Sequence, residues 1–196
     1  MGADLPATPL ELARAAAAGD ALATTRLLQS VAPKMMRVVR AVMGADAADA
    51  DDVVQQSLIG LVQALPAFRG ECEPSSYACR IAVRTAVAAR KRTRAVRARH
   101  DDATDADLVP GAPSPSDEAH ARRRKEIMRT LLEEIPEEQA EALAMRTVLG
   151  WSLEEIAASA SAPLNTIRSR LRLAKEALRR KIESVPGLAD ELGVER

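Results

Sequence analysis

The fold is decided by residues 150–178, which read GWSLEEIAASASAPLNTIRSRLRLAKEAL. Ser152 and Glu155 have the spacing of a capping box, which predicts that a short helix begins immediately after Ser152. A short turn follows, and Pro163 then predicts the start of a longer helix that continues to about Glu183. A short helix, a tight turn and a longer helix together form a helix-turn-helix.

The longer helix of this motif has two distinct faces. Apolar residues recur at i, i+4, i+7 and i+11, which predicts a buried stripe. Polar residues recur at i, i+3, i+4 and i+7 on another face, where no acid occurs between Pro163 and Lys175. Because arginine can pair with guanine and asparagine with adenine, this face is typical of a helix that reads the DNA major groove; the alternative is an ordinary solvated face. The stripe is Ile167, Leu171, Ala174 and Leu178, and the polar face is Asn165, Arg168, Ser169 and Arg172.

The composition excludes several classes of protein. Of the 196 residues 47% are hydrophobic but only 2% aromatic, so we expect an aliphatic, helical core. No apolar run approaches ~18 residues, so we expect no membrane insertion. Residues 1–7 lack the pattern of a signal peptide, which favours a cytoplasmic protein. Cys72, Cys79 and His100 are too few and too scattered for a disulfide framework or a structural zinc site, so we expect neither a metal nor a cofactor.

Charge divides the chain, although 28 Lys and Arg residues balance 28 Asp and Glu residues overall. Residues 101–120 hold six acids, three prolines and no Lys or Arg, which predicts a flexible acidic linker. We therefore expect an all-α chain of two helical modules, at residues 8–98 and 120–184, joined by a linker at 99–119. We also expect this linker to leave the two modules separately positioned.

Apolar spacing predicts four helices in the first module. Asp20 is the expected N-cap of the second helix, which Pro33 kinks or restarts, and Pro66 ends the third. Ser75 or Ser76 is the expected N-cap of the fourth helix. The expected ranges are about 10–18, 20–43, 49–65 and 77–99, with an ordered loop before the fourth helix.

Two further surfaces of the first module carry charge. The fourth helix has eight cations and no acid after its start, which favours binding to a polyanion, since an ordinary solvated face usually mixes signs. Asp49, Asp52 and Gln55 share a band at the start of the third helix. Physical reasoning leaves two interpretations of these acids, a partner surface or acids that stabilise the helix dipole. The cations are Arg80, Arg84, Arg90, Lys91, Arg92, Arg94, Arg97 and Arg99.

Six segments of this sequence together resemble the extracytoplasmic-function (ECF) sigma factors. DADDVVQQSL at 49–58, ALPAFRGE at 64–71 and YACRIA at 77–82 are similar to region 2 of that family. IPEEQAEAL at 135–143, GWSLEEIA at 150–157 and NTIRSRL at 165–171 are similar to region 4. Their order and spacing, around an intervening linker, make the joint resemblance specific; it covers roughly residues 10–95 and 120–182.

The resemblance implies a promoter-recognition subunit of bacterial RNA polymerase, which is not an enzyme. Its partners would be core polymerase, through the β′ clamp and the β flap, promoter DNA and an anti-sigma factor. The linker would occupy the RNA-exit path of the polymerase. By matching positions, Asp49, Asp52 and Gln55 would bind the clamp, and Asn165, Thr166, Arg168, Ser169 and Arg172 the −35 element. Phe68, Arg69, Tyr77, Arg80, Arg84, Arg90 and Lys91 would bind the −10 element.

The sequence departs from the family pattern at several positions. Gln56 replaces a glutamate, Tyr77 replaces a tryptophan, and the basic residue expected at Leu173 is missing. Aromatic residues are also absent at Leu58, Val62 and Cys79. Since strand capture uses base stacking, Phe68 and Tyr77 are the aromatic candidates left near the −10 surface.

Two other classes of protein are alternatives to this interpretation. A dimeric helix-turn-helix regulator, with residues 1–100 as a sensor, would bind its operator without core polymerase and give a symmetric footprint. A recombinase or nucleotide-modifying enzyme would need clustered catalytic groups. Asp51 and Asp52 could ligate Mg²⁺, but no glycine-rich phosphate loop accompanies them.

Overall fold

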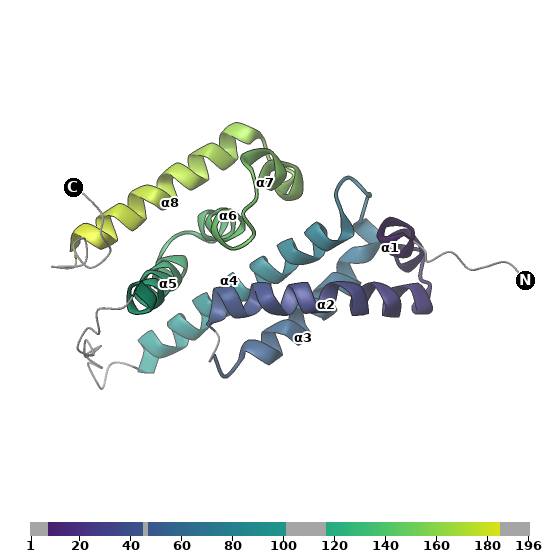
Figure 1. Ribbon diagram of the computed structural model, residues 1–196, viewed down its shortest axis with the longest axis horizontal. Helices are drawn as coiled ribbons and strands as arrows, with labels where there is room; N and C mark the ends of the chain where they lie inside the picture. The colour runs from purple at the N-terminus through teal and green to yellow at the C-terminus, as the bar shows by residue number, and fades with distance from the viewer. Residues whose placement is uncertain (1–7, 45–46, 101–116, 185–196) are drawn as a thin grey trace, which may run out of the picture.

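The computed structural model describes residues 8–44, 47–100 and 117–184, and within them every regular element is a helix. This confirms the predicted all-α class. The helices fall into two groups, α1 to α4 and α5 to α8 (Figure 1). Their bounds are α1 (Pro9–Ala17), α2 (Ala21–Met43), α3 (Ala50–Ala64), the 3₁₀ turn η1 (Leu65–Ala67), α4 (Pro74–His100), α5 (Asp117–Glu134), α6 (Glu137–Val148), α7 (Leu153–Ala160) and α8 (Leu164–Ser184).

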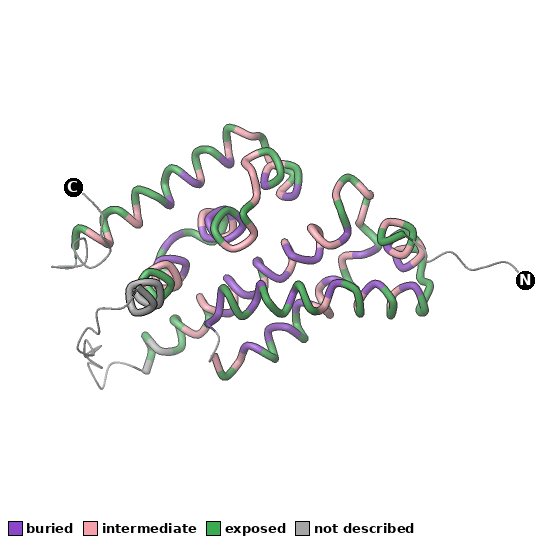
Figure 2. The backbone as a smooth tube through the Cα atoms, in the orientation of Figure 1, coloured by how far each residue is buried: buried purple, intermediate pink, exposed green. Residues whose placement is uncertain are grey.

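The first module is built around α4, which packs against both α2 and α3. Its core is aliphatic, as the composition predicts, because the α2 and α4 stripes contribute valine, alanine and methionine. Cys79 is 1% exposed and packs as a small apolar residue in this core. Figure 2 shows buried positions recurring along α2 and α4.

Two helix boundaries in this module differ from the prediction. Pro33 does not restart a helix, because α2 runs unbroken from Ala21 to Met43 with the proline inside it. Val31 and Met35, on either side of Pro33, are 3% and 0% exposed. Burial of this face therefore outweighs the backbone hydrogen bond that the proline cannot make.

Helix α4 begins at Pro74 rather than at Tyr77, so neither Ser75 nor Ser76 is its N-cap. Proline suits a first helical position, since its φ is already fixed near the helical value. The amide nitrogen of Tyr77 donates to the carbonyl oxygen of Glu73 at 3.0 Å, which places the first turn upstream of both serines.

The second module is centred on α6, which packs against α5, α7 and α8. The predicted stripe of α8 faces this helix: Ile167 and Ala174 are fully buried, Leu171 is 5% exposed, and Leu178 is half-buried at the edge. Trp151 is half-buried against the same core.

The two modules contact each other, so the prediction that they are separately positioned is wrong for this structure. Helix α4 packs against α5, α6 and α7, and one apolar cluster runs through both modules. Cations on α4 face carboxylates on α5 and α6, so charge and apolar burial both favour the contact. The charge of each sequence segment does not reveal this pairing, because the paired residues lie far apart in the sequence.

The middle of the predicted linker lies outside the described residues. Its two ends are helical, since α4 continues to His100 and α5 begins at Asp117. The predicted module boundaries at 8–98 and 120–184 stay predictions. Across the described ranges, no helix combines the length and the hydropathy that crossing a bilayer requires.

Candidate nucleic-acid and polymerase interfaces

The turn between α7 and α8 is fixed by local hydrogen bonds. Ser152 caps α7 reciprocally: its hydroxyl accepts from the Glu155 amide at 3.1 Å, and its own amide donates to the Glu155 carboxylate at 2.7 Å. At the other end Ser161 adopts a left-handed conformation with φ of 49°. The amide of Ala162 donates to the Ala157 carbonyl at 3.1 Å, which closes the turn. The capping box and both helix ranges are confirmed.

The polar face of α8 is exposed along its whole length. Asn165, Arg168, Ser169 and Arg172 are all exposed, while neighbouring Thr166 is half-buried. Their contacts stay within the helix: Arg168 donates to the Asn165 side-chain oxygen at 3.2 Å. Arg172 pairs with a glutamate one turn further along, at 2.6 Å. These side chains are therefore available to a groove of DNA without any rearrangement of the fold.

A hollow beside this face holds cations that sequence reasoning missed. It has a volume of about 520 Å³ and is lined from α6, α7 and α8. Arg146 is held there by donating to the Trp151 carbonyl at 2.6 Å. Lys175 could have been found by continuing the polar spacing of α8, but Arg146 belongs to a different helix. The charged side chains that line the hollow are Arg146, Arg168, Arg172, Lys175, Glu176 and Arg179.

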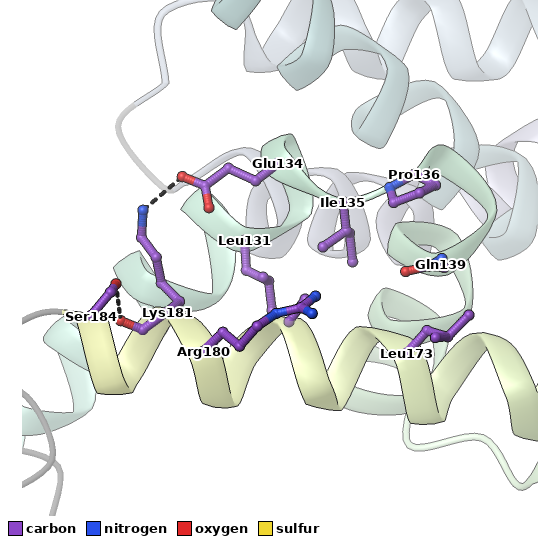
Figure 3. A pocket seen from close by; sticks show the side chains of 10 residues that line it. Leu131, Glu134, Ile135, Pro136, Gln139, Leu173, Arg180, Lys181 and Ser184 are labelled. Atoms are coloured by element: carbon purple, nitrogen blue, oxygen red, sulfur yellow. Dashed lines mark hydrogen bonds and ion pairs between the residues drawn. The ribbon is translucent and has the colours of Figure 1, made fainter.

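A second groove lies on another face of the same module (Figure 3). It has a volume of about 650 Å³ and runs between α8 and the junction of α5 with α6. Leu131 and Ile135 form its apolar floor, and Leu173 stands at its edge with 38% exposure. An ion pair of 2.7 Å between Lys181 and Glu134 joins the two walls.

The cations of α4 are placed differently from those of α8. Arg84 pairs with Glu141 at 3.5 Å, and Arg90 pairs with Glu133. Two others donate to backbone carbonyl oxygens of the second module. We call this set the inter-module interface: Arg80 with the Ser159 carbonyl, Arg84 with Glu141, Arg90 with Glu133, and Lys91 with the Ile135 carbonyl.

Burial at this interface shifts two pKa values. Desolvation lowers the pKa of Lys91, with Glu137 acting in the opposite direction. Desolvation also raises the pKa of Glu141, which the positive charge of Arg84 partly offsets. Both shifts have the sign expected when charged groups leave water, so this contact is partly dehydrated.

The two aromatic candidates for base stacking contact each other. The rings of Phe68 and Tyr77 are 5.0 Å apart between centroids and tilted by 50°. Both are half-buried against the core, and the Tyr77 hydroxyl donates to the Ala64 carbonyl at 3.1 Å. This pair anchors the loop before α4, next to Arg69, which is exposed.

The start of α3 presents a mixed polar and apolar surface. Asp52 and Gln55 are exposed, and Asp49 is half-buried at the N-cap position, where its side chain makes no capping hydrogen bond. Ile59 and Val62 follow on the same face with 57% and 40% exposure. Acids that merely stabilise a helix dipole need no apolar neighbours, so the exposed Ile59 and Val62 favour a partner surface.

The cysteines offer no metal site. Burial is the main cause that raises the pKa of Cys79 and of half-buried Cys72. Among the described residues, no group of three His, Cys, Asp or Glu side chains could hold a metal ion.

Comparison with known proteins agrees with this arrangement. Residues 27–96 match the family model described as Sigma-70 region 2, and residues 125–178 match Sigma-70 region 4. The ECF RNA polymerase sigma-E factor of Escherichia coli (strain K12) is 32% identical over 146 residues, which cover 69% of this chain and 74% of that protein. This chain belongs to the ECF family of sigma factors.

Other relatives of this sigma factor support the same family and fold. The RNA polymerase sigma-H factor of Pseudomonas aeruginosa is 34% identical over 149 residues, covering 70% of this chain and 75% of that protein. The solved structure of CnrH in complex with the cytosolic domain of CnrY covers 91% of this chain and 99% of that chain. It has a TM-score of 0.53 at 18% identity, which shows a shared fold.

Proposed function

We propose that this sigma factor binds core RNA polymerase, recognises the −35 and −10 elements of a promoter and promotes transcription initiation. The observation that carries the proposal is the exposed polar face of α8, presented by a completed helix-turn-helix within a chain that matches both sigma regions. Asn165, Thr166, Arg168, Ser169 and Arg172 are assigned to the −35 element on this ground.

The first module supplies the other contacts in this proposal. The face of α3 with Asp49, Asp52 and Gln55 binds the β′ clamp, and its exposed Ile59 adds apolar contact area. The loop before α4 and the α4 cations engage the −10 element. These residues are Phe68, Arg69, Tyr77, Arg80, Arg84, Arg90 and Lys91.

The remaining partners follow from the family. The groove between α5, α6 and α8 is the surface we assign to the β flap, since it has an apolar floor and its lining includes none of the five residues assigned to the −35 element (Figure 3). An anti-sigma factor is a further partner. The protein acts in the cytoplasm, has no catalytic activity of its own and needs no cofactor.

In vitro transcription with purified core polymerase on a genomic library tests the proposal. We expect specific transcripts only when both the chain and core enzyme are present. A dimeric regulator would instead bind its operator tightly without polymerase and leave a symmetric footprint, and that result would overturn the proposal.

The clamp assignment is tested separately with Asp52→Ala. Loss of this exposed carboxylate should weaken core polymerase binding without changing which promoter is preferred. Glu154→Ala is the matched control, because Glu154 is an exposed acid in the first turn of α7 and has the same dipole effect. Equal losses for the two variants would contradict the assignment.

The acidic linker is tested by deleting residues 101–107, which contain four of its acids. If this segment occupies the basic RNA-exit path, the deletion should lower holoenzyme affinity and initiation. Unchanged affinity and initiation would count against this part of the proposal.

A further inference from the structure

Two hollows adjoin the polar face of α8, and they differ in chemistry. The hollow already described, which Arg168 and Arg172 line, is rich in cations. A second hollow, of about 500 Å³, lies between α8 and the start of α6. The five residues assigned to the −35 element divide between the two hollows, since Asn165, Thr166 and Ser169 line the second one. DNA bound to this face of α8 would therefore meet two different surfaces.

The charges of the second hollow are already paired. Among its lining residues only Glu138 of α6 and Arg170 of α8 are charged, and they form an ion pair of 2.5 Å. A phosphate group would therefore meet a cation here that is bound to a carboxylate, whereas the cationic hollow offers several arginines and a lysine. The second hollow thus suits an uncharged group of the DNA.

The aliphatic side chain that lines this hollow from α8 is Leu173, which is 38% exposed. An isolated exposed leucine is ordinary on a protein surface, so the position of Leu173 is the informative feature. It follows Ser169 by four positions and Asn165 by eight, and residues with this spacing form one ridge of a helix. Figure 3 shows Leu173 on α8 and Gln139 on α6 at the same end of the larger groove. Side chains assigned to base reading thus continue directly into an apolar one.

The major groove of DNA presents an apolar group of matching size, the C5 methyl group of thymine. The O4 acceptor of the same base lies beside this methyl group, and a serine hydroxyl can donate to it. Ser169 and Leu173 are one helical turn apart, so they offer a donor and an apolar surface side by side. This pair of side chains is complementary to the major-groove edge of a thymine.

We propose that Leu173 is a specificity-determining residue of α8, which contacts the methyl group of a thymine in the −35 element. This inference rests on the proposed function for the identity of the DNA. A basic residue at this position would act through its charge and its hydrogen bonds, both of which leucine lacks. The departure from the family pattern at Leu173 therefore changes which base is preferred, and not only how tightly the DNA is held.

The test replaces one thymine of the −35 element at a time by deoxyuridine, which removes the C5 methyl group and keeps the base pair. The duplex is the promoter on which the chain directs transcription, and fluorescence anisotropy measures its affinity for the holoenzyme. For the unaltered chain, one replacement should weaken binding about threefold to fourfold, which is the effect of burying one methyl group. The Leu173→Ala holoenzyme should bind the thymine and deoxyuridine duplexes equally.

Three further variants control this comparison. Leu173→Met keeps an apolar side chain of similar volume, so it should keep the preference for thymine. Leu22→Ala removes an exposed leucine from α2, outside the helix-turn-helix, and should also keep the preference. Circular dichroism checks that Leu173→Ala is folded, and Leu173→Gln takes its place if it is not.

Two results would overturn the inference. In the first, no single deoxyuridine weakens binding by the unaltered chain. In the second, Leu173→Ala distinguishes thymine from deoxyuridine as well as the unaltered chain does. If that variant also binds core polymerase more weakly, Leu173 belongs to the groove assigned to the β flap, which it lines as well.

These outcomes are separate from those that test the proposed function. If the chain gives no transcripts with core polymerase, the sigma activity is overturned. The deoxyuridine replacement is then made in the duplex that the chain alone selects from a random library, and a thymine preference that depends on Leu173 still supports methyl recognition. Normal transcription without that preference overturns methyl recognition alone.

Discussion

Helices α4 and α8 are both long and rich in arginine, yet their cations differ in exposure and in bonding partners. On α8 four of the five predicted DNA contacts are exposed, and Arg168 and Arg172 bond to neighbours on the same helix. On α4 four predicted DNA contacts bond to the other module, and Arg90 is 11% exposed. Helix α8 thus presents side chains that contact only their own helix, whereas four cations of α4 already contact the second module.

The difference shows that a cationic helix does not by itself define an accessible DNA surface. Both helices carry a run of cations without acids, which is the composition that favours binding to a polyanion. The two helices differ in what they pack against. Helix α8 buries its apolar stripe within one module, whereas α4 is the central helix of its own module and also contacts the second module. The four predictions below test this contrast, from the largest expected effect to the smallest.

The largest effect should come from the buried apolar stripe of α8, which lies opposite the exposed polar face. Ile167 is fully buried, so Ile167→Ala should reduce the free energy of unfolding by about 2–5 kcal/mol. Urea denaturation followed by circular dichroism measures this loss. The control is Leu173→Ala on the same helix, where the side chain is 38% exposed and the loss should be smaller. Equal losses at the two positions would show that α8 is not anchored by this stripe.

The next effect concerns base reading by α8. Arg168→Ala should cost about 1–3 kcal/mol of binding at the matched −35 sequence and relax the preference there. Footprinting and competition between matched and mismatched promoters measure both changes, with holoenzyme as the binding species. Arg180→Ala removes an equal charge from the groove face of α8 and should leave the preference intact. An unchanged footprint for Arg168→Ala would falsify its role.

A smaller effect should follow from removing the cap that starts α7. Ser152→Ala loses the hydroxyl that accepts from the Glu155 amide at 3.1 Å. The expected cost is about 0.5–2 kcal/mol of stability, measured by thermal or urea unfolding. Ser184→Ala, at the exposed end of α8, should change stability little. If both serines behave alike, the capping box does not contribute to the helix-turn-helix.

The smallest effect concerns the reactivity of two thiols, Cys79 on the buried side of α4 and Cys72 in the loop before this helix. Because burial raises the pKa values of Cys72 and Cys79, less thiolate is present at neutral pH than for a free thiol. Both should therefore react slowly with a thiol reagent in the native protein and rapidly once it is unfolded. Cys79, 1% exposed, should be the slower. Equal native and unfolded rates would contradict the packing of α4.

Several features could be predicted from the sequence because they depend on neighbours along the chain. The capping box at Ser152, the N-cap at Asp20 and the ranges of α7 and α8 are all local hydrogen-bond and spacing effects. The start of α4 was predicted wrongly because two serines looked like better caps than Pro74. Of the two effects expected of Pro33, a restart of the helix does not occur, since tertiary burial of Val31 and Met35 was not visible in the local pattern.

The parts of the candidate site that lie on one helix could also be predicted, whereas contacts between separate elements could not. The polar face of α8 follows from helical periodicity, and its exposure agrees with that expectation. Arg146 was missed because it reaches the same hollow from another helix. The pairing of Phe68 with Tyr77 was also missed, since both were considered as separate candidates for base stacking.

By itself, the sequence determined the helical class, the helix-turn-helix and the family, because periodicity, capping and motif order are written along the chain. Only the tertiary structure decided which cations are available. Arg84 and Glu141 are 57 positions apart in sequence but 3.5 Å apart in space, and no local pattern encodes that distance. Burial and charge pairing depend on which surfaces meet, and that is a property of the folded chain.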